Sequence, residues 1–350
     1  MILTTRPAWL LAISGAVLLT ALAATGAPLL VYSVTLAVFG LPHVLSELRY
    51  VSRRFGPDLG ERLRLGLVIL LGGVLLLRGG RQLGWWEGLS VTRVELLLAL
   101  SLALLVAPAL WRAGGRPRVI GLGLLALGAI GVAISPVHTL FALAIAHNWT
   151  PVGFFADAYS GARRRGVMLA CFLVFLVVPL LIASGLPMQG LSRLGLYSPE
   201  QSVLPTGPLA GHLGAYLAPD WRDRPWTEAA FQALVYAQCL HYAAVLLVLP
   251  RLQTAPTGWP ARLAEIADLR WSTMCVGAAL VSLAWYSLDF AGAKGFYSLP
   301  AGVHAWVELP LLLLAMCPPQ PKSAPTPKDA ALAARLMSAA RPQETGSVTR

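Results

Sequence analysis

Apolar residues recur along the chain in runs of close to twenty, the length that a helix needs to cross a bilayer. Short connections that contain Arg, Gly or Pro separate these runs. The pattern predicts an all-α fold, a polytopic membrane helix bundle of about ten transmembrane helices. The division between the fifth and sixth of these helices depends on Pro136 alone. The ten predicted spans cover residues 8–23, 28–51, 64–80, 89–111, 118–136, 137–156, 166–186, 228–249, 271–290 and 296–316.

Arginine clusters occupy every second connection, over residues 52–63, 112–118, 157–166 and 250–270. Cytoplasmic loops of membrane proteins carry an excess of Lys and Arg, so we expect these four connections and both termini to be cytoplasmic. The long connection 187–227 is then external. It is rich in Pro, Gly and aromatic residues, and it is either a lid over the outer mouth of the bundle or a plain surface loop.

The two ends of the chain carry signals of their own. Arg6 before the first run and the small residues of Ala21-Leu22-Ala23 are also compatible with a signal peptide, as an alternative to a first span. From Pro318 onward the chain is rich in Pro, Ala, Ser and Lys and has no apolar run. We therefore expect a transmembrane domain over residues 1–317 and a disordered cytoplasmic tail over 318–350.

The composition supports a membrane protein and excludes some chemistry. Of the 350 residues, 57% are hydrophobic and only 12% are charged. The net charge of +11 comes from arginines that act as topology signals, so we expect no nucleic-acid partner. The four cysteines stand singly and form no metal-ligand pattern, which indicates packing residues. We expect a multi-pass protein of a bacterial-type inner (plasma) membrane, in contact with membrane lipids.

Four of the six histidines lie inside predicted spans, where an ionisable group is costly and is a candidate for function. All four spans run from outside to inside. The histidines precede the inner ends of these spans by 8 to 12 residues. This spacing places them roughly 12–18 Å from the inner end, near the middle of a ~30 Å hydrocarbon core. We predict one shared site formed by His43, His147, His241 and His304.

The other two histidines are expected at an interface or a surface. His138 is at the outer end of a span, and His212 is in the external connection.

Carboxylates accompany two of the four intramembrane histidines. In the stretches HVLSE and HAWVE, Glu47 follows His43 and Glu308 follows His304 by four residues, so each pair shares one helix face. Outer carboxylates of this kind accept the ring N–H of a metal-ligating histidine, fix its tautomer and raise its basicity. We expect Glu47 and Glu308 to be the catalytic carboxylates of the site.

Amide groups accompany the other two histidines. Asn148 follows His147, and Gln238 lies about one turn before His241. We expect these amides to join the carboxylates in an outer layer around the imidazoles.

Neutral imidazole suits Fe, Cu, Zn and Ni, whereas the lack of intramembrane cysteine pairs argues against iron–sulfur or thiolate sites. Fe(II) is our first choice. Four imidazoles in a six-coordinate geometry leave open positions where dioxygen, as co-substrate, and an apolar substrate can meet. Glu47 and Glu308 would orient the ligands, act as ligands themselves, or bridge the two ions of a dinuclear centre.

The stretch GLPH, with an acidic residue one turn later, resembles the G-x-P-H-G-x-x-D pattern of the integral-membrane β-carotene 15,15'-dioxygenase family associated with bacterial rhodopsins. The match covers Gly40 to Glu47, with Val44 in place of the second Gly and Glu47 in place of Asp. The resemblance implies an all-helical membrane enzyme in which histidine-bound, non-haem iron cleaves a carotenoid to retinal. It carries over to His43 as an iron ligand and to Glu47 as its acidic companion.

The expected function is a histidine-ligated, non-haem iron oxygenase or hydroxylase. Its substrate would be a lipophilic small molecule, such as a carotenoid, an isoprenoid or a lipid, and its electron donor, if one is needed, is unknown. Three alternatives stay open: a haem-binding quinone oxidoreductase, a proton- or metal-ion-coupled transporter, and a scaffold whose polar residues only pack. In a scaffold, Glu47 would pair with Arg49, Arg53 or Arg54 at the cytoplasmic boundary.

Overall fold

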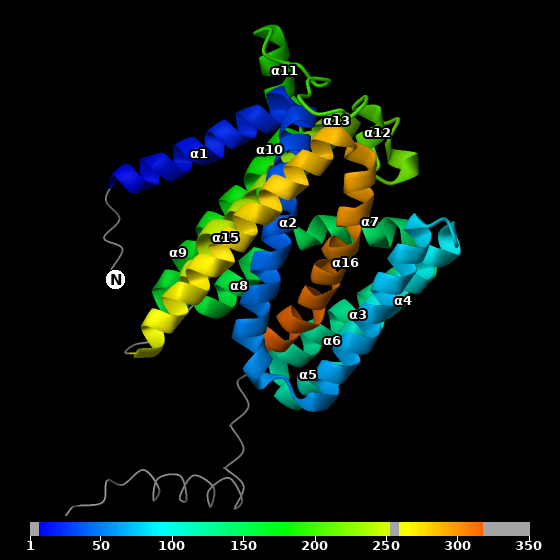
Figure 1. Cartoon of the computed structure of the whole chain (residues 1–350), viewed down its shortest axis with the longest axis vertical. Coiled ribbons are helices and arrows are strands. Elements are labelled where there is room, and N and C mark those ends of the chain that lie inside the picture. Colours follow the sequence, from blue (N-terminus) through cyan, green and yellow to red (C-terminus); the bar gives the residue numbers. More distant parts are fainter. Residues whose placement is uncertain (1–6, 253–258, 318–350) are drawn as a thin grey trace, which may run out of the picture. The chain divides into compact units, whose positions relative to one another are not determined.

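The computed structural model describes residues 7–252 and 259–317, and these residues form helices and connections without a β-strand (Figure 1). The predicted tail at 318–350 lies outside the described residues. The helices are α1 (Pro7–Gly26), α2 (Pro28–Phe55), α3 (Glu61–Gln82), α4 (Leu89–Leu104), α5 (Ala107–Ala113), α6 (Gly115–Ile134), α7 (Pro136–His147), α8 (Thr150–Ala158), α9 (Gly161–Phe172), α10 (Val178–Ala183), α11 (Leu186–Arg193), α12 (Ala210–Leu213), α13 (Thr227–Ala243), α14 (Leu249–Leu252), α15 (Trp259–Leu288) and α16 (Phe290–Ala315).

Short helical turns of other types complete the chain. Two 3-10 turns, η1 (Gly56–Asp58) and η3 (Pro219–Trp221), lie in connections. Two π-helical turns, η2 (Leu173–Val177) and η4 (Ala244–Val248), join α9 to α10 and α13 to α14. Such π turns occur mostly as single insertions within longer helices, and here each one continues a span.

Eight segments of the described chain are long and apolar enough to cross a membrane, which makes this a multi-pass helical membrane protein. These segments are Pro28–Phe55, Glu61–Gln82, Ser90–Ala113, Gly115–Ile134, Gly161–Ala183, Thr227–Leu252, Asp268–Leu288 and Phe290–Ala315. Each corresponds to one predicted span. The remaining two predicted spans, 8–23 and 137–156, correspond to the shorter apolar helices Leu11–Gly26 and Pro136–His147.

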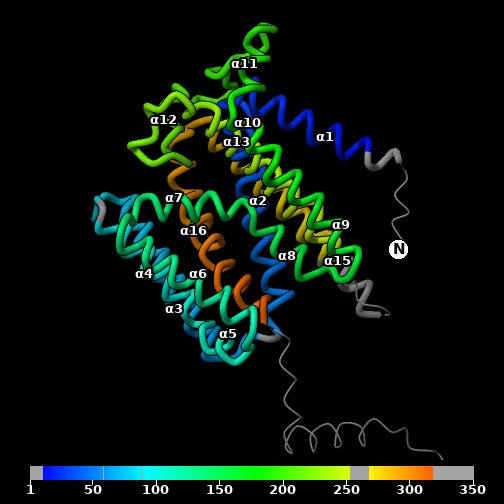
Figure 2. Tube along the Cα trace, turned by 180° about the vertical axis from the view of Figure 1, so that it is seen from behind, coloured from blue at the N-terminus to red at the C-terminus, as the bar shows by residue number. Residues whose placement is uncertain are grey.

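The prediction of one continuous helix over residues 137–156 is wrong. The chain forms α7 and α8 there, separated by a break at Asn148 and Trp149. α7 lies across the neighbouring long helices in both views (Figures 1 and 2). His147 is the last residue of α7, so it stands at a helix end and not in the middle of a span.

Pro151 gives the physical reason for this break. A proline has no N–H, so it cannot donate to the carbonyl oxygen four residues earlier, which here belongs to His147. The Thr150 hydroxyl donates to that oxygen instead, at 2.9 Å. The sequence His-Asn-Trp-Thr-Pro therefore ends one helix at a histidine and begins the next within three residues.

Three spans form the interior of the bundle. In α2, in α13 with its continuation to Leu252, and in α16, 50%, 56% and 44% of the most apolar stretch is buried, more than in the other five spans. Three of the four intramembrane histidines are on these buried spans: His43 on α2, His241 on α13 and His304 on α16. The most enclosed part of the fold therefore carries the candidate chemistry.

An ion pair between Arg78 and the buried carboxylate of Glu95 links α3, α4 and α16. Arg78 donates to Oε1 of Glu95 from Nε at 2.8 Å and from Nη2 at 2.5 Å, and it also donates to the carbonyl oxygen of Ser298 at 2.7 Å. Trp306 Nε1 donates to the same Glu95 oxygen at 2.9 Å. Gly302 makes room for the guanidinium, since a Cβ there would lie 2.4 Å from Arg78 Cζ.

The Gly302→Ala substitution is therefore expected to lower the free energy of unfolding by about 1–3 kcal/mol, the usual effect of overpacking a filled site. The melting temperature of the purified protein in one detergent measures the effect. Gly277→Ala on α15 is the matched control, because nothing lies within 4 Å of a Cβ at that position. An alanine there should be neutral or slightly stabilising, as in most helix interiors. Equal melting temperatures for the two variants would contradict the tight approach of Arg78 to α16.

The connection 187–227, called the external connection for its predicted side, contains the short helices α11, α12 and η3, and it packs against the bundle (Figure 1). His212, which is predicted to lie at an interface or a surface, is buried and is not a surface residue. His212 is only 5% exposed, its ring lies 5.5 Å from that of Tyr32 and 5.3 Å from that of Phe290, and its Nε2 donates to the Thr206 carbonyl at 2.9 Å. His138 is half-exposed and meets Asp220 at 3.1 Å, as expected of a histidine at a helix end.

Acidification is expected to loosen this external segment. Burial lowers the pKa of His212 below its ordinary value of 6.5, so the packed segment binds a proton less readily than the released one. The packed state therefore has its maximal stability, as far as His212 determines it, above pH 6.5, and this stability falls as the pH decreases below that value. Hydrogen exchange of residues 200–218 at pH 7.5 and pH 5.5 would measure this. A His212→Gln variant keeps an N–H donor for Thr206 and should lose the pH dependence; an unchanged dependence would show that another group titrates.

Candidate metal centre

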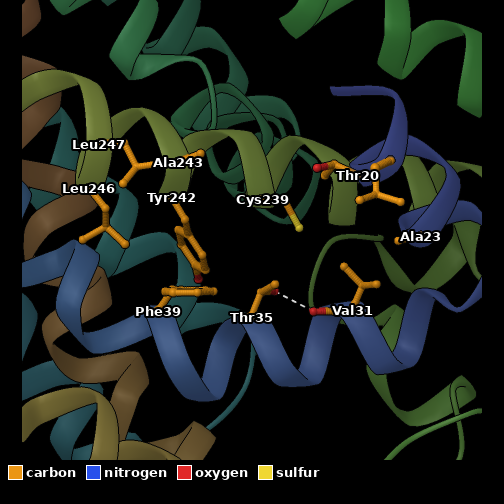
Figure 3. Close-up of a pocket in the computed structure, with 11 residues that line it drawn as sticks. Thr20, Ala23, Val31, Thr35, Phe39, Cys239, Tyr242, Ala243, Leu246 and Leu247 are labelled. Atoms are coloured by element: carbon orange, nitrogen blue, oxygen red, sulfur yellow. Dashed lines mark hydrogen bonds between the residues drawn. The ribbon is translucent and has the colours of Figure 1, made fainter. Parts of the chain in front are cut away.

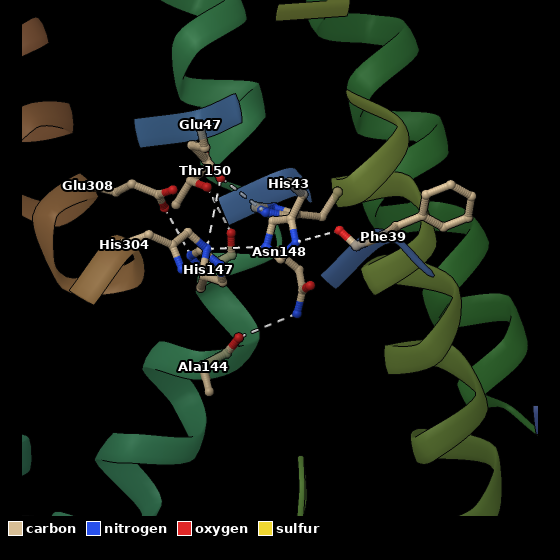
Figure 4. Close-up of polar contacts among 10 residues, drawn as sticks. Phe39, His43, Glu47, Ala144, His147, Asn148, Thr150, His304 and Glu308 are labelled. Carbon is tan, nitrogen blue, oxygen red and sulfur yellow. Dashed lines mark hydrogen bonds and ion pairs between the residues drawn. The ribbon is translucent and has the colours of Figure 1, made fainter. Parts of the chain in front are cut away.

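Four imidazoles from four helices come together inside the bundle, and Figure 4 labels three of them, His43, His147 and His304. Each offers one ring nitrogen, and these nitrogens all lie within 4.8 Å of one another. The residues are His43 of α2, His147 of α7, His241 of α13 and His304 of α16. The predicted convergence of these four side chains is confirmed.

Two of the imidazoles are held so that Nε2 is free for a ligand. His43 Nδ1 lies 3.2 Å from the carbonyl oxygen of Phe39, and His147 Nδ1 lies 2.9 Å from Oε2 of Glu308. Both acceptors require the proton on Nδ1, which leaves the lone pair on Nε2. His43 Nε2 in turn lies 3.3 Å from His304 Nε2. Nitrogen atoms therefore face each other across a small space, as metal ligands do.

Each carboxylate contacts histidines of other helices and not the histidine one turn away on its own helix. Glu308 of α16 contacts His147 of α7. Oε2 of Glu47 lies 3.3 Å from His241 Nε2 and 4.0 Å from His304 Nε2. Both carboxylates are buried, with Glu47 at 1% and Glu308 at 0% exposure. They therefore lie inside the cluster, and their contacts join all four of its helices, α2, α7, α13 and α16.

The alternative that Glu47 pairs with the boundary arginines does not hold. Arg49 pairs with Asp268, and Arg54 pairs with Asp157 at 2.8 Å. Glu47 faces imidazoles instead. The arginines therefore act at the exposed end of α2, separately from the buried carboxylate.

The predicted outer amides bond elsewhere. Asn148 Nδ2 donates to the Ala144 carbonyl at 3.3 Å, in the last turn of the preceding helix α7. Gln238 receives the Tyr216 hydroxyl on its oxygen and donates to Thr35 Oγ1 at 3.1 Å. Sequence proximity to a histidine was a poor guide here, because neighbours along a helix point in different directions.

Unpaired polar atoms are concentrated at this cluster. Buried side-chain atoms without a hydrogen-bond partner include both oxygens of Glu47, both ring nitrogens of His241, Nδ1 of His304 and Oε1 of Glu308. Buried polar atoms in folded proteins are nearly always paired, because desolvation without a partner is costly. A cation among these oxygen and nitrogen lone pairs would supply the missing interactions, so the residues present fit a metal ion.

The acidic side chains define a second group that overlaps the first. Glu47, His304 and Glu308 also offer ligand atoms within 4.8 Å of one another. Two carboxylates beside neutral imidazoles carry up to two negative charges in a buried space, which one divalent cation would balance. The overlap through His304 is compatible with one ion or with two adjacent ions.

A cavity of about 300 Å³ opens from the four histidines toward the external connection. Its wall includes Arg78, Lys294, Tyr297 and, from the external connection, Ala215 and Tyr216. Two residues of the connection 187–227 therefore border this cavity.

Tyr242 is a site residue whose role the sequence did not indicate. Its ring lies 4.1 Å from that of His43, centroid to centroid. It lines the cavity and also a second hollow, an apolar groove of about 450 Å³ between α1, α2 and α13 (Figure 3). Only its position directly after His241 was a signal, and an aromatic residue beside a histidine on a helix is common enough to be uninformative.

Comparisons with known proteins give no relatives: no family model, no curated protein and no solved structure matches this chain.

Proposed function

We propose that this protein is an integral-membrane, non-haem iron oxygenase or hydroxylase that acts on a lipophilic substrate. His43, His147, His241 and His304 would hold Fe(II), with dioxygen as co-substrate. The observation that carries the proposal is the set of four ring nitrogens within 4.8 Å of one another, surrounded by buried, unpaired carboxylate oxygens. Lone histidines that merely join helices would not share one centre.

The donor set favours a bare metal ion over a haem. A haem clamped between two of these imidazoles would occupy the space of the other two, since all four nitrogens lie within the same 4.8 Å. All-nitrogen and carboxylate donors suit Fe(II) and other first-row ions, whereas no cysteine of the described chain belongs to the cluster. Histidine and carboxylate sites with open positions are typical of non-haem Fe(II) oxygenases, which favours iron within this group.

Glu308 and Glu47 have distinguishable tasks in this proposal. Glu308 accepts the Nδ1 proton of His147 at 2.9 Å, which fixes the tautomer and the ring orientation. Glu47 has both oxygens unpaired beside His241 and His304, so it can become a ligand or bridge to a second ion. The dinuclear version would use the overlapping group of Glu47, His304 and Glu308.

A lipophilic substrate fits the position of the centre. Three of the four histidines lie on helices long and apolar enough to cross a membrane, and dioxygen also partitions into hydrocarbon. Cleavage of a carbon–carbon double bond would place one atom of dioxygen on each carbonyl product and needs no reductant. Hydroxylation of a C–H bond would release the second oxygen atom as water and needs two electrons and two protons from a donor. A carotenoid is one candidate for the first reaction.

The proposed topology completes this picture. Ten crossings, with α1 and the α7–α8 pair as the two that fall outside the eight long segments, would put both termini in the cytoplasm of a bacterial-type inner membrane. Arginine-rich connections on one side support this orientation.

Metal analysis tests the proposal. Protein extracted gently from iron-supplied cells is expected to contain about one iron per chain, or about two if the centre is dinuclear, and to lack a Soret band. Wild-type protein without any transition metal would contradict the metal centre. Stoichiometric zinc or copper that iron cannot replace would contradict the choice of iron while leaving the site in place.

A further inference from the structure

The apolar groove on the outside of the histidine cluster is the strongest feature that the metal centre does not use. Eleven residues line it: Leu19, Thr20, Ala23, Val31, Thr35, Phe39, Cys239, Tyr242, Ala243, Leu246 and Leu247. Its volume of about 450 Å³ is within the range of small-molecule sites, ~300–1,000 Å³.

The groove opens toward lipid. Phe39 and Leu247 lie on spans and are 42% and 58% exposed, and Leu19 on α1 is 69% exposed. The outward surface of a span faces hydrocarbon, so whatever fills this hollow reaches it through the bilayer.

The groove offers almost nothing to a polar group. The hydroxyl of Thr20 donates to the Ala16 carbonyl at 2.8 Å, and that of Thr35 donates to the Val31 carbonyl at 2.6 Å (Figure 3). Both threonines therefore use their donors within their own helices. What remains toward the groove is mostly CH₃, CH₂ and ring surface, which fits a hydrocarbon chain and not a headgroup.

The groove borders the histidine cluster along its inner wall. Tyr242 borders both the groove and the 300 Å³ cavity, and its ring packs 4.1 Å from that of His43. Phe39, on the groove side, provides the carbonyl oxygen that His43 Nδ1 contacts. The same turns that hold His43 and His241 therefore form the inner wall of the groove, and the Tyr242 ring separates the two hollows.

We infer that the groove between α1, α2 and α13 binds the hydrocarbon chain of the substrate, and that Tyr242 is a positioning residue controlling how far the chain reaches toward the histidines. This inference rests on the proposed function and names its substrate class, a molecule with a long apolar chain that arrives laterally from the membrane. The Tyr242 ring would hold the hydrocarbon chain of the substrate beside the histidines. It would also separate the cavity from the groove until a substrate is bound.

The test uses a photoactivatable chain, hexadecanol with a mid-chain diazirine, added to the full-length protein in nanodiscs. Mass spectrometry then locates the cross-links. Wild-type protein should be labelled at groove residues above the level at other lipid-facing positions. Ala243→Phe fills the groove and should reduce labelling there by about tenfold. A change of one methylene group in an apolar pocket already alters discrimination about tenfold or more, and a phenyl ring is larger. Ala126→Phe is the matched control, because Ala126 is exposed on α6 and lines neither hollow.

A second pair of variants tests Tyr242. Tyr242→Ala should extend the labelling to Leu140 and Leu143, which line only the cavity, whereas Tyr242→Phe keeps the ring and should label as the wild type does. Groove labelling could equal that of any lipid-facing surface and persist in Ala243→Phe. That result would mean that only annular lipid occupies the groove, and it would overturn the inference. So would equal labelling patterns for Tyr242→Ala and Tyr242→Phe.

Iron measured on the same samples separates this inference from the proposed function. Groove labelling that responds to Ala243→Phe in protein without iron would retain the chain site and reject the iron centre. Iron-loaded protein without preferential groove labelling would retain the centre and reject the chain site.

Discussion

The His304→Ala variant is expected to lose at least about 90% of its bound iron, a larger effect than any other single substitution at the centre. His304 belongs to both overlapping ligand groups, and its Nε2 lies 3.3 Å from that of His43. Changing groups that only orient a metal ligand commonly weakens metal affinity about 10–100-fold, so removing a ligand should do at least as much. Iron content and activity toward a lipophilic substrate, both normalised to folded protein, measure the effect.

The control for this prediction is His138→Ala. His138 is half-exposed, meets Asp220 outside the cluster, and should keep wild-type iron content. Groups that act as one unit give non-additive effects, so adding His241→Ala to His304→Ala should reduce iron and activity little further. If the two substitutions instead changed stability independently and left iron content unchanged, the histidines would be packing residues and the shared centre would be refuted.

Arg78→Ala is expected to be the most destabilising substitution outside the centre, lowering the free energy of unfolding by about 3–5 kcal/mol. It would leave the buried carboxylate of Glu95, which is 3% exposed, without its cation and with Trp306 as its remaining donor. The double variant Arg78→Met with Glu95→Leu should be much less destabilised, since it removes both charges at once. Melting temperatures of the wild type, Arg78→Met, Glu95→Leu and the double variant, measured in one detergent, form the required cycle.

Arg49→Ala is the control for the buried pair. Arg49 pairs with Asp268, whose side chain is 57% exposed, and such exposed pairs contribute about 0–1 kcal/mol. A melting temperature for Arg78→Ala as high as that for Arg49→Ala would contradict the assignment of Arg78 and Glu95 as a buried, three-helix link.

The histidine cluster separates what one sequence can predict from what it cannot. The apolar runs located the spans, because a bilayer of fixed thickness requires about twenty apolar residues per helix. The helical rise then placed His43, His241 and His304 at one depth from their distance to the span ends. Axial position therefore follows from counting, and the convergence of these side chains was predictable.

His147 joins the cluster from the end of a helix and not from the middle of a span. Its predicted depth assumed a continuous helix, but Pro151 interrupts that helix, and α7 runs across the bundle. The His-Asn-Trp-Thr-Pro sequence carried that signal, since a proline removes the bond to the carbonyl four residues earlier.

Contacts between helices were decided only by the tertiary structure. The four-residue spacing puts Glu308 beside His304, yet Glu308 bonds to His147, because the rotation of each helix about its axis selects its partner. The burial of His212 and the pairing of Arg78 with Glu95 have the same origin. The sequence determined the spans, the shared depth of three histidines and the acidic residues near them. Packing alone decided which side chains meet, because helix rotation and tilt depend on neighbours distant in the chain.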